Sequence, residues 1–322
     1  MIVDSVHNGG VHGFPTLDYS VVDVFTTEPL AGNPLAVVMN TCGLATEGMQ
    51  SIAREFNLSE TTFIERREEA IERTEGVRVR IFTAQEELNF AGHPTLGTAS
   101  VLKMLAPQTV QNDTVTLKEN VGPIPVRFDT GAEGSQAADG SAGLFGEMTQ
   151  HDPEFGAELD RTVVARLAGL ELGDLDAGLP PQVVSTGTAF AIVALRSQEA
   201  LARLKVNQEE ATAWLRERGA RWFYVVAPSL DQDEHGTKCW RARMQFYGEE
   251  DPATGSAAGC AIAHLVARGA VRSGTRIHVR QGVEMGRPSD LFLSAQKENA
   301  RVSDVRVAGS TVLVAKGQLF LP

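Results

Sequence analysis

The chain of 322 residues is long enough for about two domains with sizeable hydrophobic cores. Its 41 acidic and 29 basic residues give a net charge of −12, and no basic run is interleaved with aromatic residues, so nucleic acid is not an expected partner. No segment approaches the roughly 20 apolar residues of a membrane span, so no membrane partner is expected either.

Hydrophobic periodicity predicts strands and helices in the first half of the chain. In chain order we expect a strand at residues 19–25, a turn at Gly32, Asn33 and Pro34 that leads into a second strand, a helix at 46–56, strands at 61–64 and 77–82, a helix that follows His93, and strands at 114–119 and 122–128. Residues 131–143 are small, polar and rich in glycine, which predicts a linker between two halves.

The second half is expected to be equally mixed. In chain order it should contain a strand near 144–148, a helix at 158–170, two strands around a turn within 183–195, helices at 198–204 and 208–218, a strand at 222–228, a polar loop at 231–238, a strand at 240–246 followed by a helix, and short strands at 276–282, 291–295, 300–307 and 311–321. This order lacks the regular strand and helix alternation of a doubly wound sheet. It predicts an α+β fold with more strand than helix.

The cysteines and the first residues indicate the cellular compartment. Cys42, Cys239 and Cys260 are widely spaced and form no CxxC pair, which is typical of reduced thiols in a cytoplasmic protein. Residues 1–16 are rich in glycine and histidine and have no apolar core, unlike a signal peptide. We therefore expect a soluble cytoplasmic protein with a flexible extension over residues 1–16.

Two segments of the chain follow one template. HPTLGTA at residues 93–99 and DPATGSA at residues 251–257 each have a polar residue, Pro, two further residues, Gly, a hydroxyl residue and Ala. Each comes after a strand-type segment and before an apolar helical run, so a strand, loop and helix unit occurs twice. Proline directly after a capping residue is expected where a helix begins. The repeat predicts two pseudo-symmetric halves.

The two repeated helices are unusually rich in small residues, at positions 97–100 and 255–259. Small residues let backbones approach closely, so we expect both helices to be enclosed by sheet, with both N-termini facing a shared cleft. Such N-termini attract anions, and a small anionic substrate is the expected partner. The alternative is that both segments are ordinary turns in which His93 and Asp251 cap the helices.

Glu60 is the strongest candidate for acid/base chemistry. It lies between a predicted helix and a predicted strand, close to the apolar residues Leu58, Phe63 and Ile64. A carboxylate that is half removed from water has a raised pKa, as a general acid or base near neutral pH requires. The alternative is a solvated turn residue or a cap for backbone N–H groups.

Several common enzyme signatures are missing from the sequence. GxGxxG after a strand, GxxxxGK[ST], GxSxG, HxH and HExxH do not occur, and no histidine lies near a cysteine at zinc-ligand spacing. A dinucleotide, P-loop or zinc site is therefore not expected. His264 lies inside an apolar helical run and is interpreted as a packed helix residue.

Six blocks of the sequence resemble those of the phenazine biosynthesis F protein (PhzF-like) family. They are DVFTTEPLAGNPLAVV, EFNLSETTFI, FAGHPTLGTA, GEEDPATGSAAGC, QGVEMGRPS and VLVAKGQLFL, and they follow family order from residue 23 to 321. The resemblance implies a fold like that of diaminopimelate epimerase, with two pseudo-symmetric domains that each roll a sheet around a central helix. We expect these domains at 17–133, completed by a strand at 311–322, and at 134–310.

The resemblance also implies a function. The best-known family member is an isomerase that moves a proton within trans-2,3-dihydro-3-hydroxyanthranilate without a metal or organic cofactor, and the resemblance implies that neither is needed here. Glu60 matches the acid/base glutamate of the family. The positions that match the rest of the site are His93 and Asp251, expected to act with it, and the substrate-binding residues Ser59, Gly92, Gly255 and Ser256. A homodimer is expected on the same ground, and a phenazine pathway is one possible setting among many.

Two other functions stay open at this point. Racemases of the same fold use a cysteine in each of the two loops before the central helices, but these loops hold His93 and Asp251 here, which disfavours cysteine-dependent racemisation. The second alternative is a binding protein that kept the fold and lost catalysis. The sequence does not identify the substrate.

Overall fold

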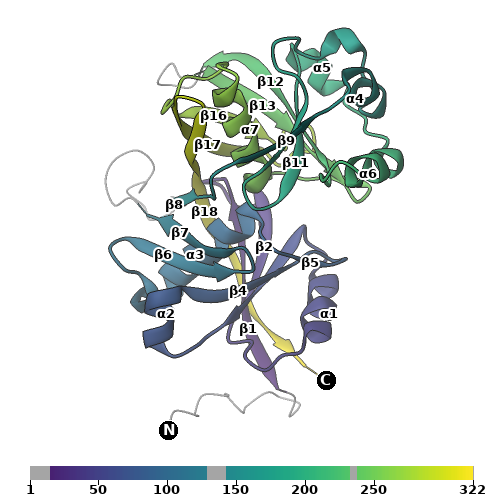
Figure 1. Cartoon of the computed structure of the whole chain (residues 1–322). Helices are drawn as coiled ribbons and strands as arrows, with labels where there is room; N and C mark the ends of the chain where they lie inside the picture. Colours follow the sequence, from purple (N-terminus) through teal and green to yellow (C-terminus); the bar gives the residue numbers. More distant parts are fainter. Residues whose placement is uncertain (1–14, 129–142, 233–237, 322) are drawn as a thin grey trace.

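The structure is a computed structural model that describes residues 15–128, 143–232 and 238–321 (Figure 1). The expected flexible extension and the expected linker lie almost entirely outside these residues. Most of the expected polar loop at 231–238 lies outside them as well. Within the described residues, no helix has the length and apolar character needed to cross a membrane.

The first half wraps a closed sheet around one helix (Figure 1). Its elements are β1 (Thr16–Val24), β2 (Asn33–Val38), α1 (Thr46–Phe56), β3 (Glu60–Glu65), α2 (Glu69–Glu75), β4 (Val77–Phe82), β5 (Glu87–Leu88), α3 (Gly92–Leu105), the short 3-10 helix Pro107–Thr109, β6 (Thr114–Glu119), β7 (Gly122–Arg127) and β8 (Leu144–Thr149). The strand order β1-β2-β3-β4-β6-β7-β8-β18 closes because β18 also pairs with β1. The helix inside this barrel is α3.

The second half repeats the plan with an open sheet around α7. Its elements are β9 (Glu154–Glu158), α4 (Arg161–Leu167), the 3-10 helix Leu172–Asp174, β10 (Gln182–Ser185), β11 (Ala189–Ala194), α5 (Gln198–Ala202), α6 (Gln208–Arg216), β12 (Phe223–Gln232), β13 (Lys238–Arg243), β14 (Gln245–Phe246), β15 (Glu249–Glu250), α7 (Gly255–Ala267), β16 (Ile277–Gln281), β17 (Ser289–Glu298) and β18 (Arg301–Phe320). Helices α4, α5 and α6 cover the outer face of β11 and β12. The predicted α+β fold class is confirmed.

Both central helices are enclosed by their sheets, as the small residues predicted. Every residue of α3 from Gly92 to Leu102 is buried, and so is every residue of α7 from Gly255 to Val266. A Cβ atom on Gly97 would lie 2.6 Å from the Leu35 side chain, which is closer than real contacts allow. The glycines therefore permit the close approach of helix and sheet.

The beginnings of both central helices differ from the prediction. Helix α3 begins at Gly92 with Ala91 as its N-cap, so His93 lies inside the first turn. Helix α7 begins at Gly255 with Thr254 as its N-cap, and Asp251 lies in the preceding loop. Neither N-cap side chain accepts a hydrogen bond from its helix. The interpretation of His93 and Asp251 as caps was wrong, because both side chains contact the Asn33 side-chain amide instead.

Further elements differ from the prediction: α2, β5 and β9 were not predicted, and three other differences have a clear cause. Strand β8, expected to open the second half, pairs with β7 and β18 in the first barrel, because periodicity does not reveal a strand's partner. Helix α4 begins later than expected, at Arg161, because the Asp160 side chain accepts hydrogen bonds from the backbone of Thr162 and Val163 and caps the helix there. Residues 300–307 and 311–321 do not form two short strands, since β18 is one strand of 20 residues.

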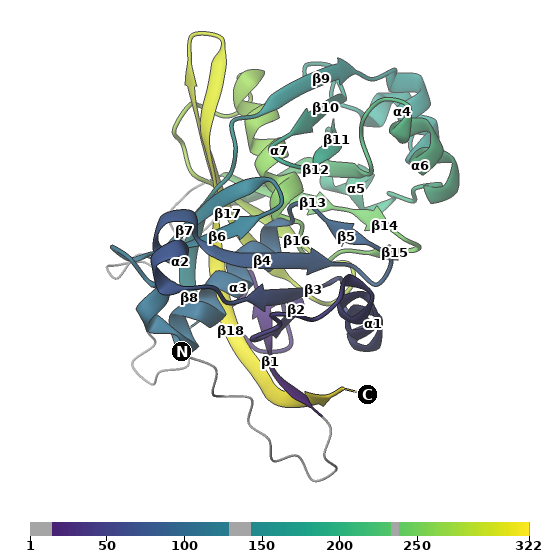
Figure 2. The ribbon, with the colours of Figure 1, turned by 60° about the horizontal axis from the view of Figure 1, so that its bottom comes forward.

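Strand β18 belongs to both halves (Figure 2). Its first part pairs with β17 in the second half, its middle pairs with β8, and residues 311–320 pair with β1 in the first half. Ion pairs among the described residues also join the halves, and two of them do not involve β18. Arg287 lies 2.8 Å from Asp23, and Arg221 lies 3.0 Å from Glu86.

Candidate active site

The N-termini of α3 and α7 meet where the two halves touch. A Cβ atom on Gly92 would overlap the backbone of Gly255 and Ser256, and one on Gly255 would lie 3.1 Å from the Gly92 carbonyl carbon. The structure thus brings together three of the predicted substrate-binding residues. Gln150 supports this junction because its Nε2 donates to the Gly255 carbonyl at 2.9 Å.

Glu60 is the first residue of β3 and faces this junction. Helix α1 ends at Asn57, which adopts the left-handed conformation, and the chain then turns into β3 beside β2. Glu60 is only 7% exposed. Its Oε2 atom lies 3.4 Å from His93 Nε2, and neither atom has a hydrogen-bond partner among the described residues. The carboxylate is therefore buried without the hydrogen bonds that usually stabilise such a charge.

The pKa of Glu60 is raised well above its ordinary value. Burial is the main cause, and the negative charge of Asp251 is the second. Burial also raises the pKa of Asp251 to about 6, although hydrogen bonds from Thr254, Asn33 and Ser59 act in the opposite direction. Two carboxyl groups near each other resist simultaneous ionisation. The site can therefore hold a proton near neutral pH.

His93 carries no charge at neutral pH. It is 2% exposed, and burial lowers the pKa of its ring to about 3. Its Nδ1 atom lies 3.1 Å from Nδ2 of Asn33, and its Nε2 atom faces Glu60. A neutral ring can form hydrogen bonds here without adding a positive charge to the site.

Asp251 is held rigidly in the loop before α7. Its Oδ1 accepts hydrogen bonds from Asn33 Nδ2 at 2.8 Å and from Ser59 Oγ at 3.2 Å. Its Oδ2 accepts one from Thr254 Oγ1 at 2.5 Å. Gln281 fixes the same loop because its Nε2 donates to the Asp251 carbonyl at 2.8 Å and to Thr254 Oγ1 at 2.9 Å. Residues from both halves therefore meet at this carboxylate.

Sequence reasoning missed three members of this network. Asn33 was interpreted only as a turn residue, and Thr254 and Gln281 received no role. All three lie inside blocks that carry the family resemblance, in GNPL, DPATGSA and QGVEMGRPS. Position in these blocks was the available signal, but the hydrogen-bond partners could not be read from it.

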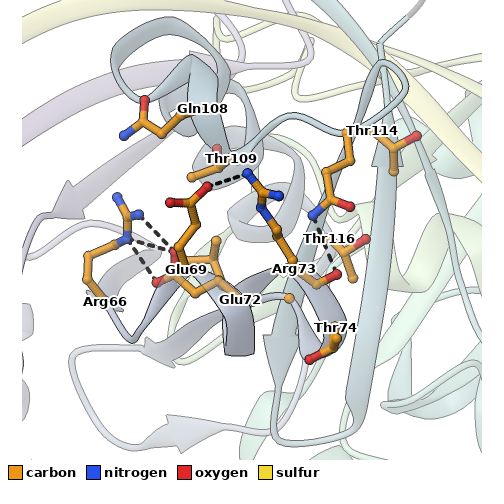
Figure 3. Close-up of a pocket in the computed structure, with 12 residues that line it drawn as sticks. Arg66, Glu69, Glu72, Arg73, Thr74, Gln108, Thr109, Thr114 and Thr116 are labelled. Carbon is orange, nitrogen blue, oxygen red and sulfur yellow. Dashed lines mark hydrogen bonds and ion pairs between the residues drawn. The ribbon is translucent and has the colours of Figure 1, made fainter.

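Two hollows on the surface lie away from these residues. A pocket of about 90 Å³ beside α2 contains Arg66, Glu72 and Arg73, whose charges pair within it, and it includes none of the predicted site residues (Figure 3). A larger groove of about 420 Å³ is lined by Glu86, Arg221, Trp222 and Tyr247 among others. Glu60, His93 and Asp251 are all nearly covered.

Metal-binding and cysteine chemistry have little structural basis near Glu60. Among residues 15–128, 143–232 and 238–321, no cluster of three or more His, Cys, Asp or Glu side chains is arranged to hold a metal ion. Cys42 is exposed, whereas Cys239 and Cys260 are buried. Cys260 contacts Thr186 and Thr188 on the α7 side of the core, and not the candidate site.

Comparison with known sequences assigns this chain to a family. The sequence model of the family described as phenazine biosynthesis-like protein matches residues 22–317. The chain belongs to this family. An uncharacterised isomerase of Mesorhizobium japonicum is 34% identical to it, over 95% of this chain and 99% of the relative. A trans-2,3-dihydro-3-hydroxyanthranilate isomerase of Pseudomonas aeruginosa is also 34% identical, over 94% of this chain and 99% of the relative.

Solved structures agree with this family assignment. A PhzF family protein of Bacillus anthracis superimposes with a TM-score of 0.77 at 26% identity, over 95% of this chain and 99% of that one. A hydroxyproline epimerase of Agrobacterium vitis shares the fold with a TM-score of 0.62 at 12% identity, over 95% and 93% of the two chains. The protein is therefore an isomerase of the PhzF-like family with an epimerase-like fold.

Proposed function

We propose that the protein is a cofactor-independent isomerase of a small carboxylate-bearing substrate, in which Glu60 moves a proton between two carbon atoms. The observation that supports this most directly is the burial of Glu60 opposite an uncharged His93, with 3.4 Å between Oε2 and Nε2. A carboxyl group with a raised pKa can accept a proton and return it near neutral pH.

The proposed reaction has two steps. The Glu60 carboxylate first removes a proton from carbon, and the electron pair of that C–H bond forms a new double bond to the neighbouring carbon. The π pair of the existing double bond moves at the same time to its far carbon. The Glu60 carboxylic acid then gives the proton to the far carbon of the shifted system. Atoms and electrons balance without an oxidant or a reductant. His93 and Asp251 hold the hydroxyl or amino group of the substrate during both steps.

The helix ends are the proposed site for the substrate carboxylate. The free N–H groups of α3 and α7 begin at Gly92 and at Gly255 and Ser256, and the positive ends of both helix dipoles meet there. Ser59 lies beside Asp251 on the same side. Because the chain has a net charge of −12, attraction of an anion must come from these local groups.

The first substrate to test is trans-2,3-dihydro-3-hydroxyanthranilate, the compound named for the Pseudomonas aeruginosa relative. It carries the carboxylate, hydroxyl and amino groups for which the site has proposed partners.

A cytoplasmic location and a homodimer also remain predictions. Light scattering of the purified protein tests the dimer.

Proton NMR of this substrate in deuterated water tests the function. Wild-type protein should introduce deuterium at carbon, and Glu60→Gln should not, with a loss of about 10²-fold to 10⁴-fold in rate. Glu65→Gln is the matched control, because Glu65 lies on the same strand and pairs with Arg78 outside the site. Deuterium incorporation that survives in Glu60→Gln would show that Glu60 is not the base.

A further inference from the structure

We propose that Asn33 is a positioning residue of the active site, whose side-chain amide joins the two halves and fixes the ring proton of His93 on Nε2. The tautomer and the contacts follow from the structure alone. The catalytic consequence rests on the proposed function of Glu60.

Asn33 is fully buried and contacts both halves through one atom. Its Nδ2 lies 2.8 Å from Asp251 Oδ1 and 2.9 Å from the Ala253 carbonyl in the second half, and 3.1 Å from His93 Nδ1 in the first half. The two oxygen atoms determine the orientation of the amide, since the reverse orientation would place the amide oxygen against two acceptors. Nδ2 therefore faces all three groups as a donor, and its two N–H protons are shared among them.

This orientation decides where the His93 proton lies. An amide nitrogen can only donate, so the Nδ1 atom of His93 must accept. The ring is neutral and carries a single proton, which must then be on Nε2. That proton points toward Glu60 Oε2, at 3.4 Å between heavy atoms. His93 can donate to the substrate or to Glu60 but cannot remove a proton, which leaves that task to Glu60.

The turn that carries Asn33 is held by the second half of the chain. Arg287 donates to the carbonyl groups of Ala31 and Gly32 at 2.8 Å each, and it also pairs with Asp23. The Gly32 N–H donates to the Pro288 carbonyl at 3.1 Å. The contacts of Asn33 with Asp251 and Ala253 therefore exist only when the two halves are in this relative position, so assembly of the site and orientation of His93 are linked.

The tautomer can be measured without turnover, on the full chain labelled with ¹⁵N-histidine. The His93 signals are assigned by their loss in His93→Gln. We expect a neutral ring with its proton on Nε2 between roughly pH 5 and pH 9. Asn33→Leu removes the donor, so the Nδ1 signal should move to the position of a nitrogen without a hydrogen bond. Asn112→Asp, in an exposed loop, should leave the His93 signals unchanged.

The kinetic consequence is measured separately. In Asn33→Leu we expect kcat to fall by about 10-fold to 100-fold, as for other residues that orient a reacting group. The acidic limb of the pH profile should move to lower pH, because loss of the Asn33 hydrogen bond raises the pKa of Asp251 and so reduces the negative charge that raises the pKa of Glu60. A residue needed only for folding would lower the melting temperature without moving this limb.

The possible outcomes separate the two proposals. A wild-type ring that is charged or carries its proton on Nδ1 overturns the role of Asn33, and this measurement needs no variant that could fail to fold. Unchanged His93 signals in Asn33→Leu overturn it as well. Loss of the Nδ1 hydrogen bond in that variant, together with no deuterium exchange by wild type on any substrate, would support Asn33 while rejecting the isomerase mechanism at Glu60.

Discussion

Glu60 and Asp251 come from opposite halves of the chain, yet the charge of Asp251 raises the pKa of Glu60. Each is nearly covered, at 7% and 3% exposure, so water screens this repulsion poorly. The raised pKa is therefore a property of the two carboxyl groups together, and it depends on contact between the two halves.

The pH profile should report this pair. If Glu60 must be ionised to act as the base, kcat/KM falls as the pH drops through its pKa, which lies well above the ordinary value of 4.5. Asp251→Asn removes a negative charge that disfavours the Glu60 carboxylate, so the acidic limb should move to lower pH even though the rate falls. A limb that stays in place or moves to higher pH would contradict the assignment.

Glu119 should make the free energy of unfolding depend on pH, independently of the pH dependence of activity. This buried residue accepts a hydrogen bond from Thr95 on one oxygen, and burial raises its pKa to about 8. The folded state therefore keeps a proton that the unfolded state loses above about pH 4.5. Stability should be complete below that pH and fall as the pH rises toward 8, by at most about 1.4 kcal/mol per pH unit.

Glu119→Gln replaces the protonated acid with a neutral group of the same shape. We expect it to raise the melting temperature at pH 8 and to change it little at pH 4. Thermal unfolding of both proteins across this range measures the difference. Equal pH dependence in the variant and the wild type would show that Glu119 is not protonated in the folded state.

The close contact between the two central helices predicts that one added methyl group lowers the stability of the folded protein. In Gly92→Ala the new Cβ would overlap the backbone of Gly255 and Ser256, which cannot rotate away as a side chain could. Destabilisation of about 1–3 kcal/mol is expected from denaturant unfolding. Gly173→Ala is the matched control, because its Cβ would meet no atom within 4 Å. Similar stability of the two variants would argue against the close helix contact.

Arg221 and Tyr247 of the second half both bind Glu86 of the first. The Arg221 guanidinium forms two hydrogen bonds of 3.0 Å to this carboxylate, and the Tyr247 hydroxyl donates one of 2.7 Å. The Arg221 and Glu86 side chains are 42% and 38% exposed, so the pair adds about 0–1 kcal/mol to stability. We expect Arg221→Met to raise KM more than it lowers kcat, because the halves are less firmly held over the substrate. Steady-state kinetics at two salt concentrations would check this, and an unchanged KM would reject it.

Local structure was largely predictable from the sequence, whereas long-range contacts were not. Helix α1 was predicted with its correct bounds because Met49, Ile52 and Ala53 repeat at helical spacing and are buried together. The enclosure of α3 and α7 followed from their small residues. The partner of β8 was missed because alternation along a strand defines its faces and not its neighbours.

The candidate site shows the same division. The motifs predicted Glu60, His93 and Asp251, and the structure places them within one buried region. They could not predict that Asn33 donates to Asp251 across 218 positions of sequence, because this contact depends on how the halves meet. The prediction that a polar side chain caps the central helix of the first half was wrong for the same reason. That helix begins at Gly92, where the backbone of the second half lies too close for a side chain.

The path of β18 determines the order in which the molecule can form during synthesis. Residues 311–320 close the first barrel against β1, and Gln318 donates a hydrogen bond to Asp18 across 300 positions. The ribosome makes these residues only after the whole second half has been translated. The first barrel therefore stays open at least until the second half has been made, and its closure is an event of high contact order that leaves the edge of β1 exposed to misassembly until then.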